Sequence, residues 1–362
     1  MNHSIAPILA AFRSATGSDL LVVASVFTPY QLLFFERLWE VLRDRPLFVL
    51  DSRPERYRVG RPPRFGEAVH VESLPLTGKV NDPEQAVLVR QGIAAVERFV
   101  DSKPFAFVCG SYQWSLNSAF YYRYRGNSDC SFFLSEEGLS SYLDIRPSLR
   151  ERWRDLARET VSRLRGFPPR PMISGHPLGH DLPELKGIIL GVAHPPEGGL
   201  RQRPFLLLPP YRAEGVAFSP DAALLIGQPY IQELGEARLT QLAAAIHHDL
   251  ARRGFRRIAF KPHHFQPEAE VAIYTAQGFD LINPPLAVEE MIPQSEFRTL
   301  AGFNSTALLT AKSLFGDSVH AIAYDPSRIV PRHEGRKEEA VEAIFREAGV
   351  EIVPLALGAL VA

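Results

Sequence analysis

The chain has 362 residues, with 40 Lys and Arg against 41 Asp and Glu, so its net charge is −1. This balance gives no support for nucleic-acid binding, which normally requires a strongly basic face. Hydrophobic residues make up 46% of the chain and charged residues 22%, as in globular proteins, and the length suits two domains. Two cysteines, Cys109 and Cys130, are too few for a disulfide framework and favour a reducing compartment.

The sequence shows no signal for export or for membrane insertion. Residues 1–16 lack the basic start and the continuous apolar run of a signal peptide. No segment reaches the ~18 consecutive apolar residues that a spanning helix needs. We therefore expect a cytoplasmic protein, and peripheral association with the inner face of the membrane is compatible with this composition.

In the first half of the chain, short apolar runs alternate with amphipathic stretches. The apolar runs predict strands at residues 20–27, 47–50, 105–109 and 130–134. Helical spacing of apolar residues predicts helices at 31–43, 85–99 and 115–123. Near-continuous apolar strands that alternate with helices favour a parallel sheet flanked by helices. Ligands of such sheets bind beyond the carboxyl ends of the strands.

The second half follows the same pattern. Strands are predicted at residues 222–226, 257–260, 279–282, 299–302 and 319–324, and helices at 234–253, 288–292, from about 306 to 314, and 337–347. Neither half contains the glycine-rich fingerprint of a classical dinucleotide site or a P-loop. Many of the 30 prolines lie between residues 168 and 210, where we expect the connection between two doubly wound α/β domains. The predicted divisions are 1–185, 186–335 and a C-terminal helix and tail at 336–362.

Two adjacent carboxylates and a glycine, Glu136, Glu137 and Gly138, follow the predicted strand at 130–134. Like charges so close together raise the pKa of one of them, which favours a general base. Acidic residues also favour the first turn of a helix, and in isolation this structural explanation is the stronger one.

Lys261, Pro262, His263 and His264 follow another predicted strand. A histidine there can bind a phosphate or a leaving group, although a plain polar loop would have the same composition. Two neighbouring histidines also raise the question of a metal, but the sequence offers no obvious third ligand, and we expect no metal site.

Asn304, Ser305 and Thr306 precede a predicted helix. Hydroxyl and backbone N–H groups at such a position form an anion site that suits phosphate. The same residues are common helix caps without any ligand, and in isolation capping explains them better. Gly227 and Gln228 have the composition of an ordinary loop.

The order of these motifs resembles that of the bacterial sialyltransferases of GT-B architecture. Their shared pattern is a D/E-D/E-G motif, then an H-P motif, then an S/T-S/T motif. Residues 28–31, Thr-Pro-Tyr-Gln, are similar to a T-P-x-Q segment of the lipooligosaccharide sialyltransferase and polysialyltransferase families, and residues 227–229, Gly-Gln-Pro, to a G-Q-P segment. The resemblance implies a GT-B fold, in which two facing Rossmann-like domains enclose a cleft.

The resemblance also implies an inverting, metal-independent transfer of sialic acid, or a related nonulosonate, from a CMP-sugar to a glycan acceptor of a capsule or lipooligosaccharide. No cofactor is implied beyond this donor. Domain 1–185 would carry the base and the acceptor, and domain 186–335 would bind the CMP-sugar. Each matching residue takes a role. Glu137 would be the general base with Glu136 in support, and His263 would contact the phosphate and departing CMP. Ser305 and Thr306 would hold the same phosphate, and Glu289 or Glu290 would contact the ribose. The remaining residues would line the donor site (Lys261, Asn304, Gly227 and Gln228) and the cleft (Thr28, Gln31 and Gly138).

One motif departs from the family pattern. The proline that should follow the histidine is replaced by His264, although Pro262 precedes it, so the contact to phosphate is open between His263 and His264. Three alternatives also stay open: CMP-Kdo as donor, a UDP- or GDP-hexose as donor, and a non-catalytic module that binds nucleotide or glycan.

An arginine-rich segment at residues 147–164 allows two interpretations. Its arginines could line a groove for a polyanionic acceptor. We favour a solvated amphipathic helix whose apolar residues are partly buried, namely Leu149, Trp153, Leu156, Val161 and Leu164.

Overall fold

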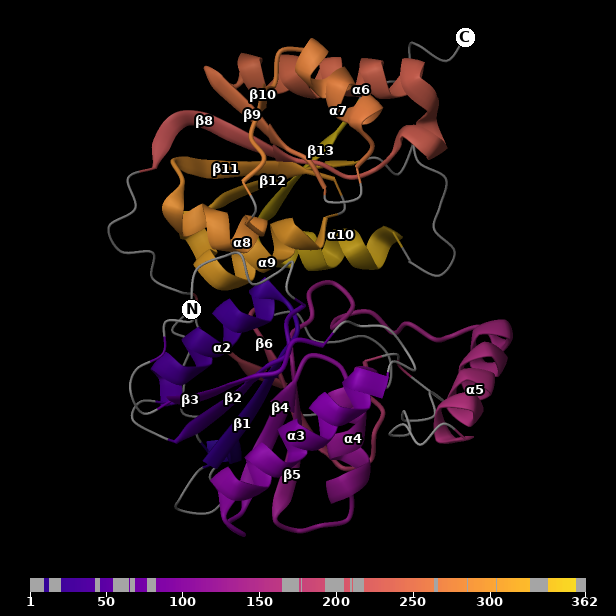
Figure 1. Cartoon of the computed structure of the whole chain (residues 1–362). Coiled ribbons are helices and arrows are strands. Elements are labelled where there is room, and N and C mark those ends of the chain that lie inside the picture. Colours follow the sequence, from indigo (N-terminus) through magenta and orange to yellow (C-terminus); the bar gives the residue numbers. More distant parts are fainter. Residues whose placement is uncertain are drawn as a thin grey trace. The chain divides into compact units, whose positions relative to one another are not determined.

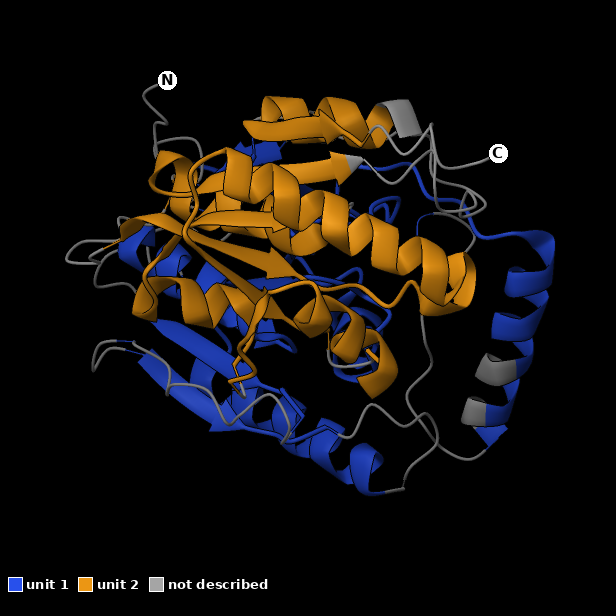
Figure 2. Ribbon diagram, turned by 90° about the horizontal axis from the view of Figure 1, so that it is seen from above, with its two compact units in different colours: residues 1–209 blue, residues 210–362 orange. Residues whose placement is uncertain are grey.

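The computed structural model describes residues 10–12, 21–42, 46–54, 65, 69–76, 83–164, 176, 178–192, 205–208, 210, 218–263, 266–284, 286–303, 305–325 and 338–355. The chain divides into two compact units, Met1–Pro209 and Pro210–Ala362 (Figure 2). Among the described helices, none is both long enough and apolar enough to cross a membrane.

The first unit is built on a parallel sheet with the strand order β3-β2-β1-β4-β5-β6-β7 (Figure 1). All of its paired strands run parallel. The strands are β1 (Leu21–Val26), β2 (Leu47–Asp51), β3 (Val69–Ser73), β4 (Phe105–Cys109), β5 (Cys130–Ser135), β6 (Leu185–Leu190) and β7 (Phe205–Leu207). The chain moves outward from β1 to β3 and then returns to the other side of β1 with β4. The carboxyl ends of β1 and β4 therefore form a topological switch point, where such sheets bind ligands.

Four helices of the first unit are α2 (Pro29–Leu42), α3 (Pro83–Val100), α4 (Ser115–Tyr124) and α5 (Leu149–Leu164). The central strands β1, β2, β4 and β5 are buried along their whole length. This burial explains their continuous apolar sequences, because both faces of a doubly wound sheet are covered.

The second unit repeats this architecture with a parallel sheet in the order β10-β9-β8-β11-β12-β13. Its strands are β8 (Ser219–Ile226), β9 (Arg257–Lys261), β10 (Asp280–Leu281), β11 (Phe297–Gly302), β12 (His320–Asp325) and β13 (Val350–Pro354). Its helices are α6 (Ile231–Arg252), α7 (Glu268–Ala276), α8 (Val288–Met291), α9 (Thr306–Phe315) and α10 (Glu338–Glu347), with short 3-10 turns at Ile292–Gln294 and Gly316–Ser318. The switch point here lies between β8 and β11.

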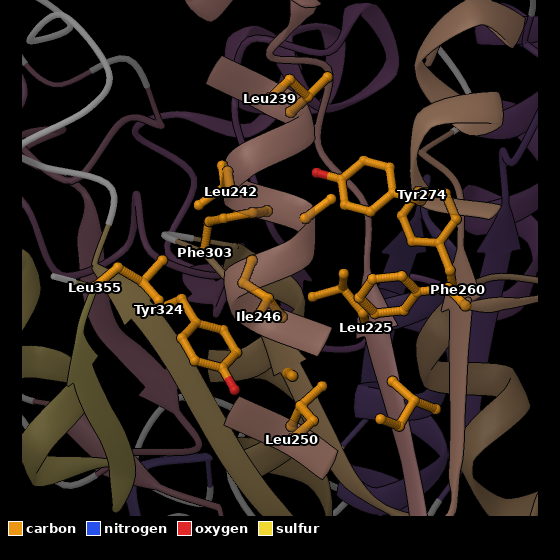
Figure 3. Packing of buried hydrophobic residues seen from close by; sticks show 14 of the residues in the cluster. Leu225, Leu239, Leu242, Ile246, Leu250, Phe260, Tyr274, Phe303, Tyr324 and Leu355 are labelled. Carbon is orange, nitrogen blue, oxygen red and sulfur yellow. The ribbon is translucent and has the colours of Figure 1, made fainter. Parts of the chain in front are cut away.

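Helix α6 supplies much of the core of the second unit (Figure 3). Leu239, Leu242, Ile246 and Leu250 recur at helical spacing and are fully buried against the sheet. Phe260 of β9 stacks on Tyr274 of α7, with ring centroids 4.2 Å apart. The predicted helix at 234–253 is confirmed, but it begins one turn earlier and is interrupted at Gly235 (φ 73°).

The expectation of two doubly wound α/β domains is confirmed, but several details differ. Four strands were not predicted: β3, β6, β7 and β13. The predicted boundary after residue 185 is wrong, because β6 and β7 pair onto the sheet of the first unit and the division follows Pro209. The described part of the predicted C-terminal segment, residues 338–355, belongs to the second unit, because its strand β13 pairs with β12.

The predicted helix at 147–164 is present as α5 (Leu149–Leu164). Leu156 and Val161, each 40% exposed, are partly buried as expected, but the other three apolar residues are largely exposed. Leu149, Trp153 and Leu164 are 73%, 70% and 83% exposed.

Candidate active site

Three segments of the first unit meet at the carboxyl ends of β1, β4 and β5. Gln31 lies in the first turn of α2, Gly110 follows β4, and Glu137 follows β5. The Gln31 Nε2 donates a hydrogen bond to Glu137 Oε2. A Cβ atom on Gly110 would overlap both of these atoms. Glycine is therefore required at position 110 for the amide and the carboxylate to meet.

The side chain of Gln31 is fixed from both of its ends. Its Oε1 accepts a hydrogen bond of 2.6 Å from the backbone N–H of Phe27, so Nε2 is the atom that faces Glu137. Thr28 Oγ1 accepts from the backbone N–H of Gln31 at 3.2 Å, as a helix cap does. Thr28 and Pro29 thus begin α2 so that Gln31, which is fully buried, points at the carboxylate.

Glu137 has the properties of a general base. Its side chain keeps partial exposure, whereas its neighbour Glu136 is completely buried. Burial raises the pKa of Glu137 to about 7, and the hydrogen bond from Gln31 partly opposes this increase. A base with a pKa near neutrality combines a substantial deprotonated fraction with good proton affinity.

A tight turn after Glu137 holds its backbone. Gly138 adopts φ 74°, a left-handed conformation that side chains disfavour. The backbone N–H of Glu137 donates to Ser141 Oγ at 2.7 Å, and the N–H of Ser141 donates to the Gly138 carbonyl at 3.0 Å. The segment is thus a fixed turn and not the start of a helix, which was the competing interpretation.

Glu136 is held by three hydrogen-bond donors. Its carboxylate accepts hydrogen bonds from Tyr30 Oη (2.7 Å), Tyr142 Oη (2.6 Å) and the backbone N–H of Gly191 (2.6 Å). These partners belong to α2, to the loop after β5 and to the end of β6. Burial raises the pKa of Glu136, and the three hydrogen bonds oppose that rise. Glu136 therefore connects these three elements through its carboxylate.

In the second unit, the loops after β8 and β9 are tied together by Gln266. Its Nε2 donates to the Gln228 carbonyl at 3.2 Å, and its Oε1 accepts from the backbone N–H of His263 at 2.9 Å. A Cβ atom on Gly227 would overlap Gln266 Oε1. The segment at 227–228, predicted as an ordinary loop, therefore has a fixed conformation that requires glycine.

Glu270 completes this connection from α7. It is fully buried and accepts from the backbone N–H groups of Tyr230 (3.0 Å) and Ile231 (3.3 Å), at the start of α6. Gln266 Nε2 also donates to it, at 3.0 Å. A carboxylate in this position satisfies helix N–H groups that have no intrahelical partner.

Lys261 and Glu289 interact electrostatically in the second unit. Lys261, the last residue of β9, is 8% exposed, and burial lowers its pKa while the charge of Glu289 opposes the decrease. Glu289 on α8 accepts from Thr310 Oγ1 on α9 at 2.8 Å. Burial raises the pKa of Glu289. An ammonium with little solvent around it is suited to bind a phosphate.

Ser305 and Thr306 lie at the start of α9, after β11. Ser305 Oγ accepts from the backbone N–H of Ala307 at 3.3 Å, so the capping role is present. Ser305 is 7% exposed, whereas Thr306 is exposed. The cap leaves the Ser305 hydroxyl hydrogen available as a donor, and the helix start favours an anion.

The structure thus groups the predicted site residues by unit. Thr28, Gln31, Glu137 and Gly138 meet in the first unit. In the second unit, Lys261 lies near Glu289, and Gly227, Gln228 and His263 lie around Gln266. Asn304 and His264 lie outside the described residues. Sequence reasoning missed Gly110, Gln266 and Glu270, whose roles depend on contacts between separate strand ends.

A family model described as "Alpha-2,8-polysialyltransferase (POLYST)" matches residues 117–323. The match covers more than half of the chain and includes Glu136 to Gly138, Lys261 to His263, and Ser305. Among curated proteins, no significant match exists.

Solved structures with a similar course of the chain share little sequence with it. MurG from Acinetobacter baumannii is 10% identical, with a TM-score of 0.41 and coverage of 93% of this chain and 87% of that chain. The heptosyltransferase WaaC of E. coli, solved with ADP, is 9% identical, with a TM-score of 0.40 and coverages of 92% and 93%. A putative UDP-N-acetylglucosamine 2-epimerase from Listeria monocytogenes is 11% identical, with a TM-score of 0.45 and coverages of 91% and 88%.

Proposed function

Because the chain belongs to the alpha-2,8-polysialyltransferase family, and is thereby a glycosyltransferase, we propose that it transfers sialic acid, or a related nonulosonate, from a CMP-sugar to a glycan hydroxyl. The proposal includes inversion at the transferred carbon and independence of metal ions. The acceptor is a capsule or lipooligosaccharide glycan, and the protein works in the cytoplasm at the inner face of the membrane. The observation that carries the proposal is the partly exposed Glu137, with its pKa of about 7 and its fixed partner Gln31.

In this reaction Glu137 takes the proton of the acceptor hydroxyl as its oxygen attacks the anomeric carbon of the donor. The bond from that carbon to the CMP phosphate oxygen breaks, and the electron pair leaves with CMP. General-base action contributes a factor of about 10²–10⁴. Gln31 holds the carboxylate in position, and Gly110 leaves the space for both.

The groups of the second unit receive the departing phosphate. Lys261 supplies a positive charge with little competing solvent, and Ser305 and Thr306 offer hydroxyl and N–H donors at the start of α9. His263 is held by Gln266 at the end of β9, where its side chain would donate to the phosphate. Donors fixed in advance stabilise the developing charge, each by a factor of about 10²–10³. Glu289 is assigned to the ribose hydroxyls.

Two doubly wound units fit a division of labour in the GT-B manner. We assign the base and acceptor to the first unit and the nucleotide to the second. The reaction requires both sets of residues around one donor and one acceptor.

The decisive experiment replaces Glu137 with Gln and measures release of CMP from CMP-sialic acid in the presence of a glycan acceptor. We expect turnover to fall by at least about 10²-fold, because the amide cannot accept the proton. The control Glu97→Gln changes an exposed carboxylate on α3 and leaves turnover unchanged. A near-normal rate in Glu137→Gln would contradict the assignment.

Thermal-shift measurements with CMP, UDP and GDP test the donor class separately. We expect CMP to raise the melting temperature more than UDP or GDP. A preference for UDP or GDP would replace the CMP-sugar with a hexose donor. Release of CMP from CMP-Kdo but not from CMP-sialic acid would identify Kdo, and not sialic acid, as the transferred sugar.

A further inference from the structure

Helix α5 presents an apolar stripe to solvent. Leu149, Trp153 and Leu164 are 73%, 70% and 83% exposed, and Leu156 is 40% exposed. At about 100° of rotation per residue, these four side chains lie within an arc of about 80°. Figures 1 and 2 show α5 at the margin of the first unit. A soluble helix normally turns such a stripe inward, so its exposure indicates an interaction surface.

Arginines border this stripe on both sides. Relative to Leu149, Arg150 and Arg154 are rotated by about 100° and 140°, and Arg152 by about 300°. All three are exposed. Glu151 and Asp155 lie on the opposite side of the helix, at about 200° and 240°. Among the described side chains of α5, positive charge therefore lies at the borders of the apolar stripe, and negative charge lies on the opposite side of the helix.

We propose that α5 binds flat on an anionic lipid surface, with Leu149, Trp153, Leu156 and Leu164 inserted among the acyl chains near the headgroups. Arg150, Arg152 and Arg154 then reach the headgroup phosphates, as in other interfacial helices. Tryptophan is suited to this boundary because its ring is apolar and its N–H is polar. The proposal identifies the surface that would serve the inner-face association included in the proposed function, but it does not depend on the donor chemistry.

The charges and the apolar side chains of α5 favour an anionic lipid surface over a glycan or a second copy of this chain as its partner. A polyanionic glycan would pair with the arginines but leave the leucines and Trp153 in water. A second copy of α5 would cover the apolar stripe but bring the arginines of the two helices together, which is unfavourable. An anionic bilayer satisfies both the apolar stripe and its charged borders.

The helix is also ordered before it meets a surface. Ser148 and Glu151 form a capping box: the backbone N–H of Ser148 donates to Glu151 Oε2 at 2.8 Å, and the N–H of Glu151 donates to Ser148 Oγ at 3.3 Å. Binding therefore does not have to fold the helix, which reduces its entropic cost.

The test is co-sedimentation of the full chain with vesicles of phosphatidylcholine alone, or with about one third phosphatidylglycerol. We expect binding to the anionic vesicles and at least about tenfold weaker binding to the neutral ones. In Arg150→Gln/Arg154→Gln, binding to anionic vesicles falls about fivefold for each charge removed. In Leu149→Gln/Trp153→Gln it falls at least about tenfold. The controls Val87→Gln and Arg98→Gln make the same changes on the exposed face of α3 and leave binding unchanged.

Quenching of tryptophan fluorescence by brominated acyl chains locates the contact. We expect quenching in the wild type and its loss in Trp153→Phe, because the two other tryptophans, Trp39 and Trp114, belong to other segments. Turnover with soluble substrates should be unchanged in all α5 variants, so failure of lipid binding is distinguishable from failure of the proposed reaction. The proposal is overturned if the wild type stays in solution with anionic vesicles, if the α5 variants bind like the wild type, or if the apolar variant instead dissociates a dimer.

Discussion

At the scale of single residues, the catalytic proposal depends on how Gln31 sets the pKa of Glu137. Burial raises this pKa to about 7, and the hydrogen bond from Gln31 lowers it from a still higher value. Glu137 accepts a proton only in its deprotonated form, so kcat/KM should fall as the pH drops below about 7. In Gln31→Met the opposing hydrogen bond is lost, and we expect the acidic limb of the profile to move to higher pH.

Tyr30→Phe is the matched control for this measurement. It removes a hydrogen bond from the same helix to the neighbouring carboxylate, Glu136. We expect that variant to keep the acidic limb of kcat/KM where the wild type has it. A limb that stays in place in Gln31→Met, or that moves equally in both variants, would show that Gln31 does not tune the base.

The sequence predicts Glu137 as the base, but it does not show the surroundings of that residue. Its place after a buried strand and beside a glycine is local information. The partners Gln31 and Gly110 are distant in the chain and meet Glu137 only because β1, β4 and β5 end at one edge of the sheet. The same limit applies to Glu136, because nothing in the local sequence reveals Tyr30, Tyr142 and Gly191 around its carboxylate.

At the scale of elements, strands with uninterrupted apolar runs were predictable from the sequence, whereas β3, β6, β7 and β13 were not. The central strands carry uninterrupted apolar runs because both of their faces are buried. β3 lies at the edge, with the sequence Val-His-Val-Glu-Ser and largely exposed side chains, and β7 has three residues. Such segments form strands because a neighbouring strand offers hydrogen bonds, and their own sequences give little sign of it.

The connection between the start of α6 and α7 supports a prediction about stability. Glu270 is fully buried and accepts from Tyr230 N, Ile231 N and Gln266 Nε2. Glu270→Ala leaves these donors without that acceptor, and we expect the free energy of unfolding to fall by about 2 kcal/mol. Chemical denaturation followed by far-ultraviolet circular dichroism measures this change.

Glu268→Ala provides the comparison, because Glu268 lies at the start of the same helix but is exposed. We expect a change within about 0.5 kcal/mol there. Equal effects of the two substitutions would mean that the buried connection adds nothing beyond an acidic residue at a helix start.

At the scale of the whole molecule, the proline-rich composition indicates where the connection between the two units lies, but it does not indicate the residue at which the first unit ends. The proline-rich stretch begins before β6 and extends to Pro210, and it contains two strands that complete the first sheet. A proline-rich composition marks frequent turns, and turns occur within a domain as well as between domains.

We expect substitutions in the second unit to weaken CMP binding, and substitution of the base in the first unit to reduce turnover only. The proposed phosphate groups, His263 and Ser305, belong to the second unit, and the base belongs to the first. His263→Ala and Ser305→Ala each remove a donor to a charged phosphate, so we expect CMP to bind more than about tenfold more weakly. Glu137→Gln should bind CMP like the wild type while losing turnover, because its change lies in the other unit. Isothermal titration with CMP measures these affinities. Equal losses of CMP affinity in Glu137→Gln and His263→Ala would contradict the assignment of CMP binding to the second unit. Normal CMP affinity in both His263→Ala and Ser305→Ala would contradict it as well.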